Sequence, residues 1–234
     1  NTKLAVTGTH GKTTVTSFLA HFLCKLGRSP TYVIGAPLKH SELSSEYGSK
    51  DFCIAEADES DRSFLYLNPN IIVITNIEEE HMDQFKDLDD ILQTFSTFID
   101  RMKKNDLLII NGDDPNIKKL NLQNKKIITY GFSKDNTIQA KNLTKTNGLY
   151  SFDIKINNEI AASSVKLRIP GKHNIENCLV VYALAYYFNL PIKEVTRSFA
   201  SFEGASRRFH KIGETNDILI FDDYAHHPTE IKET

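Results

Sequence analysis

The sequence predicts an α/β protein in which helices flank a mostly parallel sheet and a small antiparallel β-sheet is appended. Three observations predict this fold class. Continuous apolar segments recur over the first half of the chain, as in strands that helices cover on both faces. Segments with apolar residues at helical spacing separate them. From about residue 137 the pattern changes to strict alternation, which is typical of antiparallel strands.

The elements of the first half follow in order. An apolar strand at 3–7 leads through a glycine-containing turn into a helix at 13–26, and a second helix is expected at 87–102. Further strands are expected at 32–34, 52–55, 71–75, 107–111 and 126–130. In such a doubly wound sheet the carboxyl ends of the strands form one edge, where ligands bind.

The second half begins with the antiparallel segment, at about 137–169. Asn147-Gly148 and Asn157-Asn158 predict tight hairpin turns within it. Two helices are then expected at 174–188 and 191–202, followed by a strand at 218–222 and a polar end at 223–234.

Bulk composition excludes several classes of protein. With 28 Lys+Arg against 30 Asp+Glu, the 234 residues indicate no nucleic-acid or anionic-membrane partner. No segment approaches the roughly 20 apolar residues of a membrane span. Cys24, Cys53 and Cys178 lie far apart in apolar segments and are expected to be buried reduced thiols in a cytoplasmic protein. Because the first residue is Asn1 rather than Met, we expect a piece of a longer protein.

The segment between the first strand and helix is a candidate P-loop, GTHGKTT. Its backbone amides and the helix N-terminus can hold phosphate oxygens, while Lys12 neutralises phosphate charge and Thr13 ligates magnesium. The spacing departs from the usual pattern because Val6 stands five positions before Gly11. A glycine-rich turn with a chance lysine is the alternative. The loop contains Gly8, Thr9, His10, Gly11, Lys12, Thr13 and Thr14.

Two polar segments follow the next strands of the predicted ligand edge. Glu56 comes directly after the strand at 52–55 and is suited to hold Mg²⁺. Asp58, Glu59 and Asp61 are equally consistent with a solvated acidic turn. His81 follows the strand at 71–75 among acidic residues, where it could hold a second cation, although a single such histidine is more often a surface residue.

Later segments add amide, guanidinium and imidazole groups. Asn174 and Asn177 share one face of a helix start and either bind ligand or cap the helix. The Arg207-Arg208 pair suits phosphate or is simply exposed. His226 and His227 are adjacent, so their side chains should point in different directions rather than share one metal ion. Contacts with nucleotide or substrate are the preferred interpretation.

Together, six motifs resemble the Mur ligase family of bacterial cell-wall enzymes, in order and approximate spacing, over essentially the whole chain. They are TGTHGKTT, EADESD, TNIEEEHMD, PGKHNIEN, GASRRF and DDYAHHPTE. The resemblance is strongest to the alanine-adding branch. It implies a central ATP-binding domain at 1–213 and the truncated start of a C-terminal ligase domain at 214–234, with the N-terminal UDP-binding domain absent.

The resemblance also implies roles for individual residues. The loop from Gly8 to Thr14 would bind the ATP phosphates. Two Mg²⁺ sites are implied, one at Thr13 and Glu56 and one at His81. Asn174 and Asn177 would lie near adenine, Asp223 near the ribose and Arg208 near the phosphates. Lys12, His81 and Arg208 are the catalytic candidates. Glu80 is a departure, because the family usually has Asp there, and no counterpart of the carbamylated lysine of later-acting members is found.

The implied activity is ATP-dependent joining of L-alanine to the lactoyl carboxylate of UDP-N-acetylmuramate through an acyl phosphate. This step belongs to peptidoglycan precursor synthesis, and with it to cell shape and division. The nearest rival is a ligase that recycles tripeptide onto the same sugar, which usually has Tyr at the position of Ser60. Folylpolyglutamate synthetase and a P-loop nucleotide-binding module without ligase activity are more distant alternatives. By itself, this piece is expected to be inactive.

Overall fold

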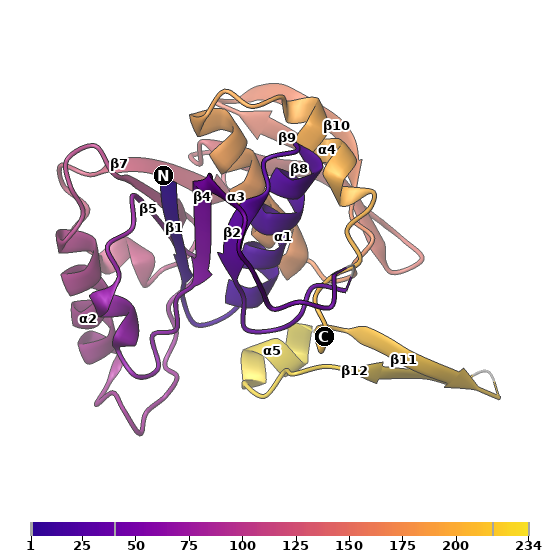
Figure 1. Cartoon of the computed structure of the whole chain (residues 1–234), viewed down its shortest axis with the longest axis horizontal. Coiled ribbons are helices and arrows are strands. Elements are labelled where there is room, and N and C mark those ends of the chain that lie inside the picture. Colours follow the sequence, from indigo (N-terminus) through magenta and orange to yellow (C-terminus); the bar gives the residue numbers. More distant parts are fainter. Residues whose placement is uncertain (1, 40, 217, 234) are drawn as a thin grey trace.

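A ten-stranded sheet forms the centre of the computed structural model, which describes residues 2–39, 41–216 and 218–233 (Figure 1). Its strand order is β10-β9-β8-β7-β6-β5-β1-β4-β2-β3. Strand β1 (Thr2–Thr7) lies in the interior and pairs in parallel with both β4 (Ser49–Glu56) and β5 (Ile71–Ile74). The remaining parallel strands are β2 (Pro30–Val33), β6 (Leu107–Asn111) and β7 (Lys126–Gly131). The predicted fold class is confirmed.

Helices cover both faces of the sheet because alternate residues of each strand point to opposite sides. In β5, Ile71 and Val73 belong to one apolar core and Ile72 and Ile74 to the other. The first core packs against α1 (Lys12–Lys25), α3 (His173–Tyr187) and α4 (Ile192–Phe199), and the second against α2 (Leu88–Asp100). Burial on both faces explains why these strands are continuously apolar in sequence.

The antiparallel segment extends the same sheet rather than forming a separate layer. It contains β8 (Ile138–Thr146), β9 (Leu149–Ile156) and β10 (Glu159–Lys166). The junction is short, since β8 pairs with β7 only at Tyr130↔Ile138 and Gly131↔Gln139. Both hairpin turns occur where predicted, and their residues have the positive φ that such turns need: Asn147 and Gly148 (51° and 80°), and Asn157 and Asn158 (51° and 69°).

The predicted helices are confirmed with small shifts at their ends. Asp87 is the N-cap of α2, and its carboxylate accepts a 2.9 Å hydrogen bond from the backbone N–H of Asp90. Three short elements were not predicted, because each has too few residues for a periodic pattern. They are β3 (Ser45–Glu46) and the 3₁₀ turns η1 (Ser63–Tyr66) and η2 (Ile117–Lys119).

The C-terminal part corrects the sequence interpretation. The expected strand, β12 (Ile218–Asp222), pairs with an unpredicted strand, β11 (His210–Thr215), in a hairpin that projects from the body (Figure 1). The polar end, for which the sequence predicted no element, contains helix α5 (Pro228–Glu233). Pro228 suits the first helical position, but the helix has no apolar period to reveal it. Figure 1 shows α5 below the start of α1.

The cysteines agree with the sequence only in part. All three thiols are free, as expected, but Cys178 alone is buried, while Cys24 and Cys53 are half-buried. Among the described residues, no helix is long and apolar enough to cross a membrane.

Candidate functional site

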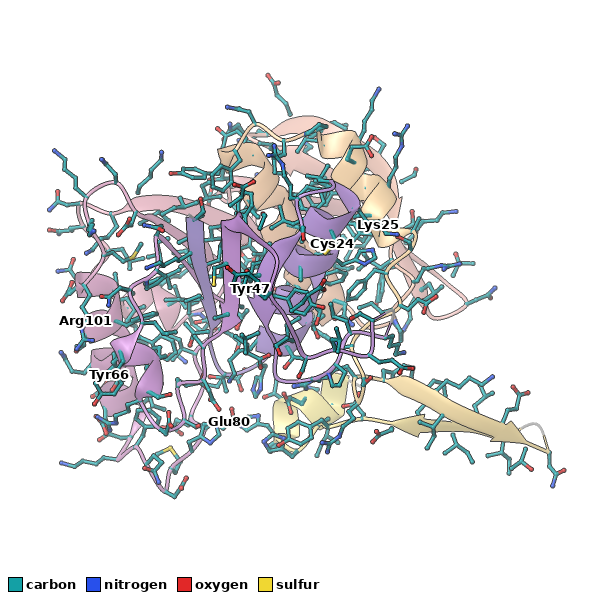
Figure 2. All side chains as sticks on the ribbon, in the orientation of Figure 1. Cys24, Lys25, Tyr47, Tyr66, Glu80 and Arg101 are labelled. Atoms are coloured by element: carbon teal, nitrogen blue, oxygen red, sulfur yellow. The ribbon has the colours of Figure 1, made fainter. Side chains whose placement is uncertain are left out.

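The candidate site lies where β1, β4 and β5 end. These three strands are parallel neighbours, so the segments that follow them meet at one edge of the sheet. The candidate P-loop (residues 8–14, called the P-loop below) follows β1, Glu56 ends β4, and the segment that contains His81 follows β5. Helix α5 approaches the same edge, and Glu80 lies beside it (Figure 2).

Glycine is required in the P-loop by conformation and by space. Gly8 has φ 122°, and a Cβ atom there would collide with Thr75 Oγ1 and lie 2.8 Å from the Asn76 carbonyl oxygen. Asn76 fixes the loop from the neighbouring strand end: its carbonyl accepts from Thr9 N–H at 3.1 Å and its side-chain oxygen from His10 N–H at 2.7 Å. Helix α1 begins at Lys12, and no side chain of the described residues caps it. Its first amides can therefore bind an anion.

The ammonium group of Lys12 is held inside the protein. Its Nζ lies 2.9 Å from both carboxylate oxygens of Glu59 and donates to the Thr9 carbonyl at 3.3 Å. Glu59 is only 3% exposed, so the solvated-turn alternative is wrong for this residue, whereas Asp58 and Asp61 are exposed. Burial raises the pKa of Glu59, and the Lys12 ammonium opposes this shift.

Thr13 and Glu56 come together, as predicted. Thr13 Oγ1 donates a 2.8 Å hydrogen bond to Glu56 Oε1, while Glu56 Oε2 accepts a 2.6 Å bond from Gly35 N–H. Two neighbouring oxygen ligands of an octahedral Mg²⁺ ion are about 2.9 Å apart, because each lies about 2.0–2.1 Å from the metal. This hydroxyl–carboxylate pair therefore already has the spacing that Mg²⁺ requires.

His81, which follows β5, lies near the carboxylates of Glu59 and Glu80. Its Nε2 lies 3.9 Å from Glu59 Oε1 and 3.7 Å from Glu80 Oε2. Asp58, Glu59 and His81 could together hold a metal ion, since each offers an atom within 4.8 Å of the others. The backbone of His81 is left-handed, with φ 54°, a strained conformation that is common at functional sites. His81 is thus partly enclosed rather than a freely exposed surface residue.

Two cavities adjoin the P-loop, and Gly11, Arg208 and Glu230 line both. The larger, of about 430 Å³, is lined by residues that include His10, Thr14, Asn174, Asn177 and Asp223. The smaller, of about 360 Å³, is lined by residues that include Thr9, Lys12, Thr13, Glu56 and His81. The predicted site residues thus separate into two groups around one loop.

Asn174 and Asn177 form a polar wall of the larger cavity rather than a helix cap. Lys172 is the N-cap of α3. Asn174 Nδ2 donates to the Pro170 carbonyl at 2.6 Å, and Asn177 Nδ2 donates to Asn174 Oδ1 at 3.2 Å. A Cβ atom on Gly11 would lie 2.6 Å from Asn177 Oδ1, so this amide packs directly against the P-loop. The capping alternative is therefore wrong.

Arg208 and Asp223 connect the C-terminal segment to the loop. Arg208 Nη2 donates to Thr13 Oγ1 at 3.4 Å, and its Nη1 lies 3.7 Å from Glu230 Oε1. Asp223 accepts bonds from the N–H groups of Phe209 (2.6 Å) and Ala225 (2.7 Å), which order the chain on either side of the hairpin. Arg207 is exposed and lies over the Tyr224 ring. It lines only the smaller cavity, whereas Arg208 lines both.

Helix α5 docks onto the loop through contacts that sequence reasoning missed. His10 Nδ1 lies 3.2 Å from Glu230 Oε1, and Thr229 Oγ1 donates to Glu78 Oε2 at 2.8 Å. Burial disfavours a charged His10, but the hydrogen bond and charge of Glu230 outweigh it and raise the pKa of His10. Burial also opposes ionisation of Glu230, yet its bond with His10 lowers the pKa of Glu230 to about 2. The DDYAHHPTE motif was the only sequence signal for these contacts.

Comparisons with known proteins identify the family of the chain. Residues 6–185 match the family model described as the Mur ligase middle domain. The chain is 41% identical over 232 residues to the UDP-N-acetylmuramate–L-alanine ligase of Caldicellulosiruptor bescii, covering 99% of this chain and 51% of that protein. A solved UDP-N-acetylmuramate-alanine ligase from Thermotoga maritima is similar at 28% identity and TM-score 0.83, covering 99% of this chain and 52% of that one. A murein peptide ligase from Psychrobacter arcticus is similar at 29% identity and TM-score 0.76, covering 98% and 52%. The chain thus spans about half the length of these proteins.

Proposed function

The chain belongs to the Mur ligase family, and on that basis we propose that the full-length protein uses ATP to join L-alanine to the lactoyl carboxylate of UDP-N-acetylmuramate. One observation carries the proposal. Thr13, which follows Lys12 in the P-loop, has its hydroxyl 2.8 Å from the carboxylate of Glu56 at the end of β4. A hydroxyl and a carboxylate at Mg²⁺ spacing beside a phosphate-binding loop suit a metal–nucleotide complex. The names of the relatives supply the acceptor and the amino acid.

In the proposed arrangement the nucleotide occupies the larger cavity and its phosphates reach over Gly11. The volume of about 430 Å³ is within the usual range for ligand pockets, about 300–1,000 Å³. Asn174 and Asn177 would contact the base and Asp223 the ribose. Arg208, which lines both cavities, would contact the phosphates.

The smaller cavity would then be the place of reaction. A carboxylate oxygen of the lactoyl group attacks the γ-phosphorus, and the bond to ADP breaks with its electron pair going to ADP. The alanine amine attacks the acyl carbon, inorganic phosphate leaves, and the amine loses a proton to give the amide. Because anions must meet, the task of Lys12 and Arg208 is to offset negative charge, and Mg²⁺ supplies further neutralisation when bound.

The divalent cations are assigned by donor chemistry. Thr13 and Glu56 would hold one Mg²⁺, and His81 would contribute to a second, beside the carboxylates of Asp58 and Glu59. Lys12, which follows β1, and His81, which follows β5, both lie within 4 Å of Glu59, so this carboxylate stands between a phosphate-binding and a metal-binding group in the proposed arrangement. No side chain is needed as a covalent nucleophile in this mechanism.

We also propose a division of the chain into a central ATP-binding domain and the first part of a C-terminal ligase domain. The boundary expected at 213/214 falls inside β11, whose pairing with β12 continues from His210 to Thr215. The boundary therefore belongs before β11. Ile212, Ile218 and Leu219 of this hairpin are at least 50% exposed, as expected of strands that pack against further residues of a longer protein.

The experiment is phosphate release by the full-length protein with ATP, Mg²⁺ and UDP-N-acetylmuramate. L-alanine, L-serine, glycine and the cell-wall tripeptide are tested separately, with Lys12→Ala as the inactive control. Release that needs both the sugar and L-alanine, and that the control lacks, is the expected result.

Two other outcomes point to the alternatives. The similarity to a murein peptide ligase makes the tripeptide a second candidate substrate, and release with tripeptide alone would establish that function. Release that does not depend on the sugar would instead indicate a nucleotide-binding module without ligase activity, and it would refute both ligase assignments.

A further inference from the structure

A second cluster of potential metal ligands lies on the other side of the P-loop from His81. It is formed by His10 in the loop, Glu78 after β5 and His227 before α5, and each offers an atom within 4.8 Å of the others. The proposed ligase chemistry uses none of these three side chains as a ligand. They come from three segments that are far apart in the sequence, so the cluster exists only when α5 is docked.

The distances suit a small tetrahedral ion. His10 Nε2 lies 3.6 Å from Glu78 Oε2, and His227 Nδ1 lies 3.9 Å from the same oxygen. Ligands at about 2.0–2.1 Å from a tetrahedral Zn²⁺ ion are about 3.3 Å apart. The rings of His10 and His227 have centroids 4.6 Å apart. His10 Nε2 would have to move about 0.3 Å and His227 Nδ1 about 0.6 Å closer to Glu78 Oε2 to reach this ligand spacing.

The orientation of His10 is a separate observation that points to a ligand. Its Nε2 is buried and has no hydrogen-bond partner among the described residues, although it faces Glu78. Its Nδ1 lies 3.2 Å from Glu230 Oε1 and can donate to it. A histidine that ligates a metal commonly gives its other ring N–H to a carboxylate, which fixes the tautomer and ring orientation. Glu230 holds His10 in this way.

The other two ligands are also supported. Thr229 Oγ1 donates to Glu78 Oε2 at 2.8 Å, which orients the carboxylate. His227 Nδ1 receives only a long bond, 3.3 Å, from Thr229 N–H, which a metal ion would replace. The adjacent His226 points elsewhere, with its Nε2 3.4 Å from Glu80 Oε1. The two neighbouring imidazoles thus serve different clusters, as the sequence suggested.

We propose that His10, Glu78 and His227 form a binding site for a divalent transition-metal ion of the Zn²⁺ type, which links the P-loop to helix α5. Two imidazoles and one carboxylate favour Zn²⁺, Co²⁺ or Ni²⁺ over Mg²⁺, which prefers oxygen ligands. Three protein ligands leave a fourth position for water. Because His10, Glu78 and Glu230 line the larger cavity, an ion here would lie at its wall.

The test is Zn²⁺ binding to the metal-depleted chain at neutral pH in excess Mg²⁺, measured by calorimetry and therefore independent of ligase activity. His227→Ala and Glu78→Gln are expected to weaken binding at least tenfold. Glu230→Gln, which keeps all three proposed ligands but replaces the carboxylate that orients His10, is expected to weaken it about 10- to 100-fold. The matched control is His226→Ala, one residue along the chain, which should bind as the wild type does.

A variant that gains an absorption band distinguishes the loss of a metal ligand from mere loosening of α5. In His227→Cys, Co²⁺ should produce the thiolate-to-metal absorption that the wild type lacks, because the new sulfur replaces an imidazole ligand. Loss of Zn²⁺ binding in His81→Ala but not in His227→Ala would place the ion at Asp58, Glu59 and His81 and overturn the proposal. So would wild-type binding no tighter than that of His227→Ala, or a His227→Cys protein without the new absorption.

Discussion

Replacing Glu59 by Gln tests how the protein holds Lys12. The carboxylate is 3% exposed and lies 2.9 Å from Nζ through both oxygens, so the change removes a buried charge partner while keeping the size of the side chain. Hydrogen bonds to charged groups contribute about 1.5–3 kcal/mol each, and Gln keeps one neutral bond. Lys12 lines the smaller cavity, where water can solvate it, so we expect a loss of about 2 kcal/mol in unfolding free energy.

The assay is thermal unfolding without nucleotide. At an unfolding entropy of about 2.1 cal/mol/K per residue, a chain of 234 residues should lose roughly 4 °C of Tm for this change. The control is Asp58→Asn, because Asp58 is exposed and its carboxylate lies 3.9 Å from the same Nζ, so its effect should be about 1 °C or less. A drop in Tm for Glu59→Gln no larger than that of the control would refute the reasoning.

Nucleotide should narrow the difference between Glu59→Gln and the wild type. If ADP and Mg²⁺ bind as proposed, the phosphates provide Lys12 with a new anionic partner. Saturating ADP and Mg²⁺ should then raise the Tm of the variant more than that of the wild type. An equal rise in both proteins would mean that Lys12 does not exchange its partner when nucleotide binds.

Three further changes test the loop, the docked helix and the metal pair. Gly8→Ala should cost about 3 kcal/mol by chemical denaturation, since its Cβ meets backbone at φ 122°, whereas Gly27→Ala, at φ 70° in open space, should cost about 1 kcal/mol. Because the pKa of His10 is raised on folding, protonated His10 stabilises the folded protein fully below the unfolded pKa of 6.5, and this stabilisation is lost as the pH rises through the folded pKa. The pKa of Glu230 is lowered to about 2, so ionised Glu230 stabilises the folded protein fully above the unfolded pKa of 4.5. Glu230→Gln should therefore lower the Tm of metal-depleted protein more at pH 6 than at pH 9, and a uniform loss would contradict the pairing. Glu56→Gln should weaken ADP binding about tenfold or more in Mg²⁺ but not in EDTA, as calorimetry would show.

The parallel half of the fold could be predicted because its signals are local. Strands such as β5, with four consecutive buried residues, are continuously apolar, and the turn from β1 to α1 needs glycine for reasons of backbone conformation. Parallel strand order then brings Thr13 and Glu56 to one edge although they are 43 residues apart. A local motif together with a topological rule was enough to place them side by side.

What could not be predicted depends on tertiary contacts between polar residues. Asp58, Glu59 and Asp61 are acidic residues of one short segment, and nothing in their spacing distinguishes them. Tertiary packing alone determines that Glu59 is buried against Lys12 while the other two are exposed. Helix α5 has six residues, too few for a period, and its contact through Glu230 reaches His10 across 220 positions. Burial of one carboxylate among three, and docking of one short helix, have no signature in sequence spacing.

The docking of α5 also bears on how the site opens. Ile231 of this helix is 61% exposed, so the helix contributes little apolar burial, and Glu230 and Thr229 hold it by hydrogen bonds and ion pairs. Such contacts are worth about 0.5–1.5 kcal/mol each, and those between exposed charges less. The core strands and α1, in contrast, are held by continuous apolar packing. Local opening should therefore begin at α5. Because Glu230 of this helix lines both cavities, release of α5 would uncover the phosphate-binding loop without unfolding the sheet.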